Sequence, residues 1–170
     1  MDPTEQILQG IARIHADVAD DLLTRLHGKE PGFFERAVVK LLVAMGYGGA
    51  DRAAKVTQQS NDEGIDGIID QDTLGLSRVY VQAKRYAPDQ SVGRPEIQAF
   101  VGALSGKADG GVFITTGRFS QGAQTYAAAV PTRVILIDGK RLTELMIRYN
   151  VGVQEKQSLR IVEIDEDFFE

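Results

Sequence analysis

The stretch DEGIDGIIDQDTLGLSRVYVQAKR, residues 62–85, decides how the fold of this chain is interpreted. It contains two runs with several isoleucine or valine residues, 64–70 and 78–84, separated by polar residues that include Gly75. Short apolar runs joined through a turn that contains glycine predict two antiparallel strands. Charged residues also occur within both runs, so the sequence predicts a hairpin that contains functional residues as well as part of the core.

Side chains alternate between the two faces of a strand, so Tyr80, Gln82 and Lys84 share one face of the second run. If the connecting turn is centred near Leu74, Asp66 in the first run lies opposite Gln82 on the same face, with Cβ atoms about 5 Å apart. Lys84 is then a diagonal neighbour of Asp66. A register shift of one residue would turn these side chains to the other face, so the arrangement depends on the register.

An acid, an amide and an ammonium group that converge in this way are suited to metal-assisted hydrolysis of a phosphodiester. The carboxylate of Asp66, the amide oxygen of Gln82 and the backbone carbonyl of Ala83 are hard oxygen ligands of the kind that Mg²⁺ takes. Lys84 is a candidate to hold or deprotonate the attacking water and to stabilise negative charge on the phosphate. A structural interpretation stays open, because Asp-Gly pairs form turns and a Lys-Arg pair often ends a solvated strand.

The composition restricts the classes of function. The chain has 170 residues, 43% of them hydrophobic, which fits one domain with a sizeable core. It has no cysteine, and its histidines, His15 and His27, both lie in one N-terminal segment, which excludes disulfides, thiolate chemistry and a structural zinc site. A formal net charge of −5 argues against attraction of nucleic acid or anionic membrane to the whole surface. No run is long enough to span a membrane, and we expect a cytoplasmic protein without a membrane partner.

The rest of the chain predicts a mixed α/β domain. Apolar residues at steps of three and four predict helices, and short apolar runs predict strands. The expected helices cover residues 4–26 and 33–45, a segment that opens at Pro95, residues 119–129 with Ser120 as N-cap, and a segment after the N-cap Asp138. The other expected strands cover residues 53–57, 111–116, 133–137 and 159–164. Strands that alternate with helices in the second half predict parallel crossovers.

The first expected helix carries an apolar stripe that has two interpretations. The stripe consists of isoleucine, valine and leucine residues at helical spacing from Ile7 to Leu26. It is either a surface for a second copy of the chain, which would give a homo-oligomer, or the face that packs against its own domain.

Six segments follow one another along the chain in a specific order. They are FFERAVVKLLVAMGYGG, NDEGIDGII, VYVQAKRY, EIQAFVGAL, GVFITTGRFSQGA and VILIDGKRLTELM. Together they resemble the catalytic domain of the Mrr-like restriction endonucleases. The resemblance covers residues 31–170, whereas residues 1–30 resemble the helix that links this domain to the rest of such chains. It implies the restriction-endonuclease-like α/β fold, in which helices flank a central mixed β-sheet.

The resemblance also implies an activity and a set of site residues. Members cleave DNA, typically modified or foreign DNA, with Mg²⁺ and an Asp…Gln-x-Lys variant of the nuclease motif, which falls here on Asp66, Gln82 and Lys84. Glu35 matches the acidic position that supports the metal in related nucleases. Glu35 also has a structural interpretation, because a glutamate in the first turn of a helix is favoured by the helix dipole.

Candidate DNA contacts lie close to the predicted hairpin. Arg85 and Arg94 belong to a basic stretch beside the proposed site, and Gln98 lies on the helix that follows. Gln98 also fits a plain surface position. The partner expected from these residues is DNA, bound mainly through phosphates and with little sequence preference.

Two features depart from the family pattern. Glu63 stands where a glycine is common, and the winged-helix domain that usually reads DNA is absent from this chain. The leading hypothesis is a Mg²⁺-dependent DNA endonuclease. Its rivals are a non-catalytic DNA-binding or assembly module on the same fold and a structure-specific resolvase.

Overall fold

The computed structural model describes residues 2–48, 58–60 and 64–170, and its centre is a five-stranded sheet. The strands, in spatial order, are β1 (Gln58–Ser60), β2 (Gly64–Asp70), β3 (Arg78–Lys84), β5 (Gly110–Thr115) and β7 (Arg133–Ile137). The first three are antiparallel, whereas β3, β5 and β7 are parallel. A short parallel pair, β4 (Ser91–Val92) and β6 (Arg118–Phe119), forms a second sheet. The predicted hairpin and the predicted parallel crossovers are therefore both confirmed.

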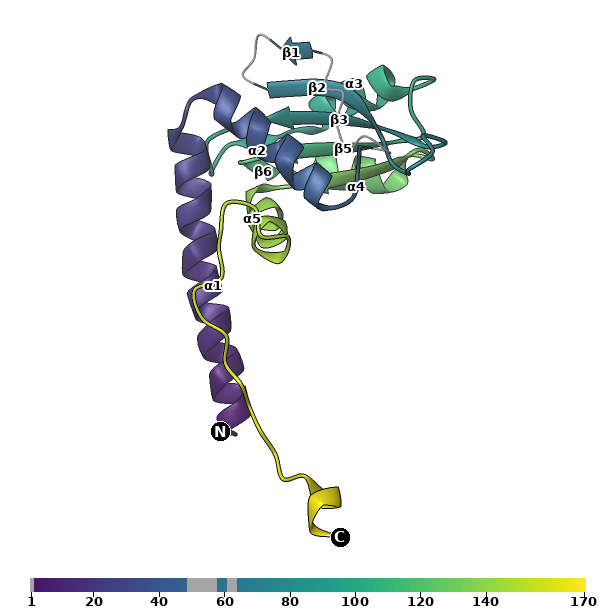
Figure 1. Cartoon of the computed structure of the whole chain (residues 1–170). Helices are drawn as coiled ribbons and strands as arrows, with labels where there is room; N and C mark the ends of the chain where they lie inside the picture. The colour runs from purple at the N-terminus through teal and green to yellow at the C-terminus, as the bar shows by residue number, and fades with distance from the viewer. Residues whose placement is uncertain (1, 49–57, 61–63) are drawn as a thin grey trace.

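Helices cover both faces of the sheet (Figure 1). They are α1 (Pro3–Gly28), α2 (Pro31–Ala44), α3 (Arg94–Leu104), α4 (Gln121–Ala129) and α5 (Gly139–Arg148), and a 3-10 turn, η1 (Glu166–Phe169), lies near the C-terminus. One hydrophobic cluster joins the sheet to α2, α5 and the C-terminal part of α1. The other joins it to α3 and α4. The expected mixed sheet flanked by helices is confirmed.

The central strand β3 explains why the sheet needs helices on both sides. Val79, Val81 and Ala83 belong to the cluster under α2 and α5, whereas Tyr80 belongs to the cluster under α3 and α4. All four are at most 7% exposed. A strand that is buried on both faces in this way is typical of sheets with parallel crossovers.

Local signals at the helix ends behave as the sequence predicts. The side chain of Ser120 accepts a hydrogen bond from the backbone N–H of Ala123, and that of Asp138 accepts one from the N–H of Arg141. Both side chains therefore satisfy N–H groups that a helix start leaves without a partner. None of the helices in the described ranges combines the length and the apolar character needed to cross a bilayer.

The structure of α1 decides between the two interpretations for one part of its apolar stripe. Leu22 and Leu26 are buried, at 8% and 2% exposure, and pack into the core of the domain. Of the earlier stripe residues, Ile14 is 62% exposed, whereas Ile7 and Ile11 are partly exposed, and Figure 1 shows the N-terminal part of the helix extending away from the sheet. The C-terminal part of the stripe thus packs against its own domain, while a role of the N-terminal part in binding a second copy stays a prediction.

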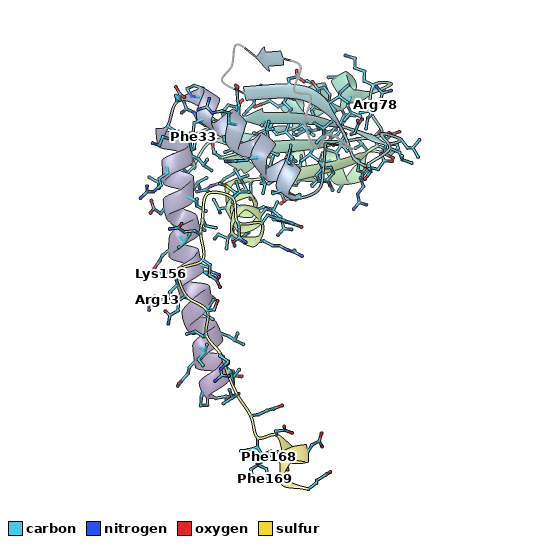
Figure 2. All side chains as sticks on the ribbon, viewed as in Figure 1. Arg13, Phe33, Arg78, Lys156, Phe168 and Phe169 are labelled. Carbon is cyan, nitrogen blue, oxygen red and sulfur yellow. The ribbon has the colours of Figure 1, made fainter. Side chains whose placement is uncertain are left out.

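The strand predicted at residues 159–164 is wrong. Residues 154–165 form neither helix nor strand and are exposed throughout. A strand exists through hydrogen bonds with a neighbouring strand, and no strand of the described sheets pairs with this segment. Figure 2 shows Phe168 and Phe169 beyond it, at the far end of the chain from the sheet. The strand predicted at residues 53–57 lies outside the described residues.

Candidate active site

The register of the hairpin brings the predicted catalytic residues together. Asp66 is directly opposite Gln82. The next pairs on the same face of the hairpin are Gly64 with Lys84 and Ile68 with Tyr80. Since side chains alternate between faces, Asp66, Gln82 and Lys84 all lie on the face of the sheet that α3 and α4 cover. The register predicted from the sequence is confirmed.

Burial on the opposite face fixes this register. Val81 is 3% exposed and Ala83 is fully buried. A slip of one residue would turn Gln82 and Lys84 into the cluster under α2 and α5, where a polar or charged group without partners is costly, and would remove these apolar side chains from it. The connecting turn adds to the constraint, because Gly75 has a φ of +74°, a conformation that favours glycine.

Asp66 lies in a partly buried environment that disfavours its charge. Burial raises the pKa of its carboxyl group, and the ammonium groups of Lys107 and Lys84 act in the opposite direction without cancelling this effect. The hydroxyl of Tyr80 donates a hydrogen bond to Oδ1 of Asp66. A cation bound at the carboxylate would favour the charged form and so offset the effect of burial.

Two residues near Asp66 were missed by sequence reasoning. Tyr80 follows from the predicted register, because it lies on the same face as Asp66 and two pairs away along the hairpin. Lys107 carries no comparable signal, since it lies in the turn between α3 and β5, far from the hairpin in sequence. Its place near Asp66 depends on the crossover that brings β5 beside β3.

Glu35 is held by α2, which covers the opposite face of the sheet from Asp66. The helix begins at Pro31, earlier than predicted, so Glu35 lies beyond the first turn and the interpretation as a helix-terminus charge is wrong. Its side chain is 8% exposed. A buried glutamate is unusual and normally requires partners, so its position calls for a role other than that of a surface charge.

The start of α2 lies at the same end of the sheet as Lys84. Arg85 directly follows Lys84, and its guanidinium donates hydrogen bonds to the backbone carbonyls of His27 and Lys29, at 3.1 Å for His27. These carbonyls belong to the last residues before α2. Glu35 lies four residues after Pro31, the first residue of α2.

The other candidate DNA contacts lie on α3. Arg94 is exposed, with its guanidinium 5.4 Å from the centre of the Tyr126 ring, and Gln98 is exposed one turn further along. Both lie on the helix that covers the same face as Asp66. Arg85, in contrast, is partly buried and bonded to the end of α1.

The chemistry of the donor set fits a magnesium ion. Asp66 supplies a carboxylate and Gln82 an amide oxygen from directly opposite positions, and the fully buried Ala83 would contribute its backbone carbonyl. No group of three or more acidic, histidine or cysteine side chains gathers within the described residues. The predicted set includes one strand-borne carboxylate, so it does not require such a group. Glu63 lies outside the described residues.

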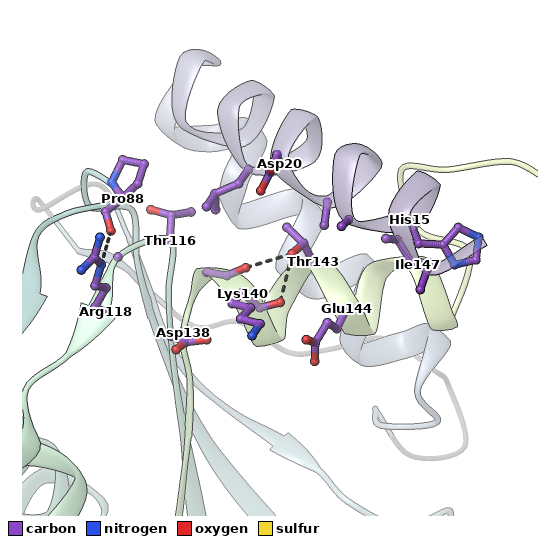
Figure 3. Close-up of a pocket in the computed structure, with 16 residues that line it drawn as sticks. His15, Asp20, Pro88, Thr116, Arg118, Asp138, Lys140, Thr143, Glu144 and Ile147 are labelled. Carbon is purple, nitrogen blue, oxygen red and sulfur yellow. Dashed lines mark hydrogen bonds between the residues drawn. The ribbon is translucent and has the colours of Figure 1, made fainter. Parts of the chain in front are cut away.

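A separate cavity of about 720 Å³ lies between α1 and α5 (Figure 3). Its wall includes charged side chains of both signs, among them Asp20, Arg118, Lys140 and Glu144. The hydroxyl of Thr143 in this wall donates to backbone carbonyls of α5, and Arg118 donates to the carbonyl of Pro88. None of the predicted catalytic residues lines the cavity.

Comparison with known proteins agrees with the fold and with the expected family. A family model described as a restriction endonuclease, Mrr_cat, matches residues 26–146. The type IV methyl-directed restriction enzyme EcoKMrr of Escherichia coli (strain K12) is 43% identical over 169 residues, which are 99% of this chain and 54% of that protein. The chain thus spans about half the length of this relative.

Two solved structures have a similar fold. The DNA modification-dependent restriction endonuclease AspBHI matches with a TM-score of 0.62 and 19% identity, over 82% of this chain and 36% of that one. The MspJI restriction endonuclease, in complex with a 27-mer oligonucleotide, matches with a TM-score of 0.53 and 26% identity, over 81% of this chain and 32% of that one. The AspBHI match shows the fold alone.

Proposed function

This chain belongs to the restriction endonuclease family, and we propose that it is a Mg²⁺-dependent DNA endonuclease domain that acts in the restriction of modified or foreign DNA. Members of the family generally use divalent metal ions. The observation that carries the proposal is the register of the hairpin, which sets Asp66 opposite Gln82 with Lys84 on the same face. The similarity to a methyl-directed enzyme supports modified DNA as the substrate.

The residues of the hairpin divide the chemistry between them. Asp66, Gln82 and the carbonyl of Ala83 would hold the metal ion. When bound, Mg²⁺ supplies Lewis-acid polarisation of the scissile phosphate. The ammonium group of Lys84 orients the attacking water and donates to the phosphate oxygens as negative charge develops there.

Glu35 has a supporting role in this proposal. The contacts of Arg85 with the residues before α2 support a place for Glu35 near the end of β3. From there a buried carboxylate would add negative charge near the metal ligands and Lys84. Loss of Glu35 is therefore expected to weaken metal binding less than loss of Asp66.

DNA approaches the face that α3 covers. Arg94 and Gln98 are exposed there and would contact phosphates, which position a duplex without reading its sequence. Arg85 would act mainly through its contacts with the end of α1. Cutting both strands needs two sites, and the exposed N-terminal part of α1 is the proposed surface for a second copy.

The test is a cleavage assay with plasmid DNA that does or does not carry methylated bases, in Mg²⁺ and in EDTA. We expect nicking or cutting in Mg²⁺, none in EDTA, and a higher rate on methylated DNA. Binding without any cleavage would favour the non-catalytic module. Preference for branched over linear duplex would favour the resolvase.

A further inference from the structure

The hydroxyl of Tyr80 is placed to act on the metal site without touching substrate. It donates a hydrogen bond to Oδ1 of Asp66 across the hairpin. Tyr80 is paired with Ile68, while Asp66 is paired with Gln82, so the bond runs diagonally between the strands. One oxygen of the carboxylate is thereby engaged, whereas Oδ2 accepts no hydrogen bond from the residues that the structure describes.

A chain of aromatic rings holds Tyr80 in place. Its ring centre is 5.3 Å from that of Phe100, which meets Phe113 edge to face at 5.5 Å, and Phe113 meets Phe119 at 5.8 Å. The rings come from β3, α3, β5 and β6, and each is at most 9% exposed. The tyrosine therefore cannot swing away from Asp66 without disturbing the core.

An aspartate alone does not keep one orientation. The terminal torsion of its side chain is broad, so a carboxylate without an anchor samples many directions. A metal ligand has to stay close to one geometry, and partners behind the ligands supply this constraint. A buried, packed hydroxyl bonded to one oxygen is such an anchor.

We propose that Tyr80 is a positioning residue that fixes the carboxylate of Asp66, so that Oδ2 is directed to the metal ion. This inference rests on the proposed function, because it takes Asp66 as a metal ligand. The alternative is that the bond serves stability alone, by giving a buried hydroxyl a partner. The two roles differ in what happens to metal binding when the hydroxyl is removed.

The experiment compares Tyr80→Phe with a matched control, Tyr86→Phe. The hydroxyl of Tyr86 also donates to a carboxylate, Oε2 of Glu96 at 3.0 Å, and Tyr86 is partly buried, whereas Tyr80 is buried. Binding of Ca²⁺ to the whole chain without DNA is measured by calorimetry, and plasmid cleavage is measured over a range of Mg²⁺ concentrations.

Tyr80→Phe is expected to weaken Ca²⁺ binding by roughly tenfold to a hundredfold. The Mg²⁺ concentration for half-maximal cleavage should rise by a similar factor, with a smaller change in rate at saturating Mg²⁺. Tyr86→Phe is expected to behave like the wild type. Equal Ca²⁺ affinity in Tyr80→Phe and the wild type would overturn the inference.

Asp66→Asn, measured in parallel, separates this inference from the proposed function. If Asp66→Asn binds Ca²⁺ as the wild type does, Asp66 is not a ligand and the proposed site itself fails. If Asp66→Asn loses binding but Tyr80→Phe does not, the role of Tyr80 alone fails.

A second variant guards against misfolding. Should Tyr80→Phe not fold, as judged by circular dichroism, Phe100→Leu loosens the support of the Tyr80 ring and leaves the hydroxyl. It is expected to weaken Ca²⁺ binding, and unchanged affinity would overturn the inference.

Discussion

The hairpin of β2 and β3 and the segment 159–164 are both short runs rich in isoleucine, valine or leucine, but only the hairpin forms strands. Val81 in the hairpin is 3% exposed, whereas Ile161 and Val162 are 64% and 70% exposed. The hairpin has a strand on each side, β1 and β5, and helices on both faces. A short apolar run thus predicts a strand where the chain also provides a neighbouring strand and covering helices, and fails where it provides neither.

The hairpin and the exposed ends of the chain are also expected to differ in how strongly a substitution affects the protein. In the hairpin, a fixed register turns sequence spacing into a defined site. Outside the body of the domain, the N-terminal part of α1 and the C-terminal segment have few contacts to lose. Substitutions in the two regions are therefore expected to differ in size.

Among residues that are not proposed metal ligands, the largest expected effect comes from Lys84→Ala. Removing a group that acts on water and phosphate should slow cleavage by about a hundredfold to a thousandfold, while Ca²⁺ affinity stays near that of the wild type. Arg78→Ala is the control, because Arg78 is an exposed basic residue at the other end of β3. Cleavage rates at saturating Mg²⁺ test this, and a parallel loss of Ca²⁺ binding in Lys84→Ala would contradict the division of roles.

Buried and exposed leucines can be compared within the single helix α1. Leu26 is 2% exposed and Leu8 is 60% exposed. Leu26→Ala is expected to lower the free energy of unfolding by about 2–5 kcal/mol, and Leu8→Ala to change it by less than about 0.5 kcal/mol. Denaturant unfolding measures both, and equal effects would mean that the exposed part of α1 packs against another surface.

A smaller effect concerns the stability of Asp66→Asn. Burial raises the pKa of Asp66 in the folded domain, so ionisation of this group disfavours the fold above its folded pKa. The penalty disappears below the unfolded value of about 3.9, where both states are protonated. Without metal, Asp66→Asn should therefore be more stable than the wild type at pH 7, and the difference should shrink as the pH falls to about 4. Thermal unfolding in EDTA measures it, and a less stable variant at pH 7 would contradict the expectation.

The smallest effect is expected in the C-terminal segment. Ile161→Ser should change the free energy of unfolding by less than about 0.5 kcal/mol, because the side chain is 64% exposed. Ile69→Ser is the comparison, since Ile69 in β2 is 3% exposed and should be strongly destabilised by a polar group. A large loss in Ile161→Ser would show that this segment has a partner in solution.

The features that could be predicted from the sequence are those that depend on residues close together in the chain. The caps Ser120 and Asp138, the bounds of β2 and β3, and the pairing of Asp66 with Gln82 follow from short-range rules and were predicted. The proximity of Lys107 to Asp66 depends on tertiary packing, which spacing does not contain.

The position of Glu35 was misjudged for a different reason. Pro31 starts α2 earlier than the apolar pattern suggests, and this moves Glu35 out of the first turn. The bond between Tyr80 and Asp66 could have been found, because it needs only the register and the alternation of faces.

The most direct test of the central claim is nicking of supercoiled plasmid by the wild type, Asp66→Asn and Asp70→Asn, each in Mg²⁺ and in EDTA. Asp70 is the matched control, because it lies on the same strand and the same face as Asp66 but is paired with Arg78, at the far end of the hairpin. We predict nicking in Mg²⁺ by the wild type and Asp70→Asn, and none by Asp66→Asn or in EDTA. Nicking by Asp66→Asn at the wild-type rate, or nicking by the wild type in EDTA, would contradict a metal-dependent site at Asp66.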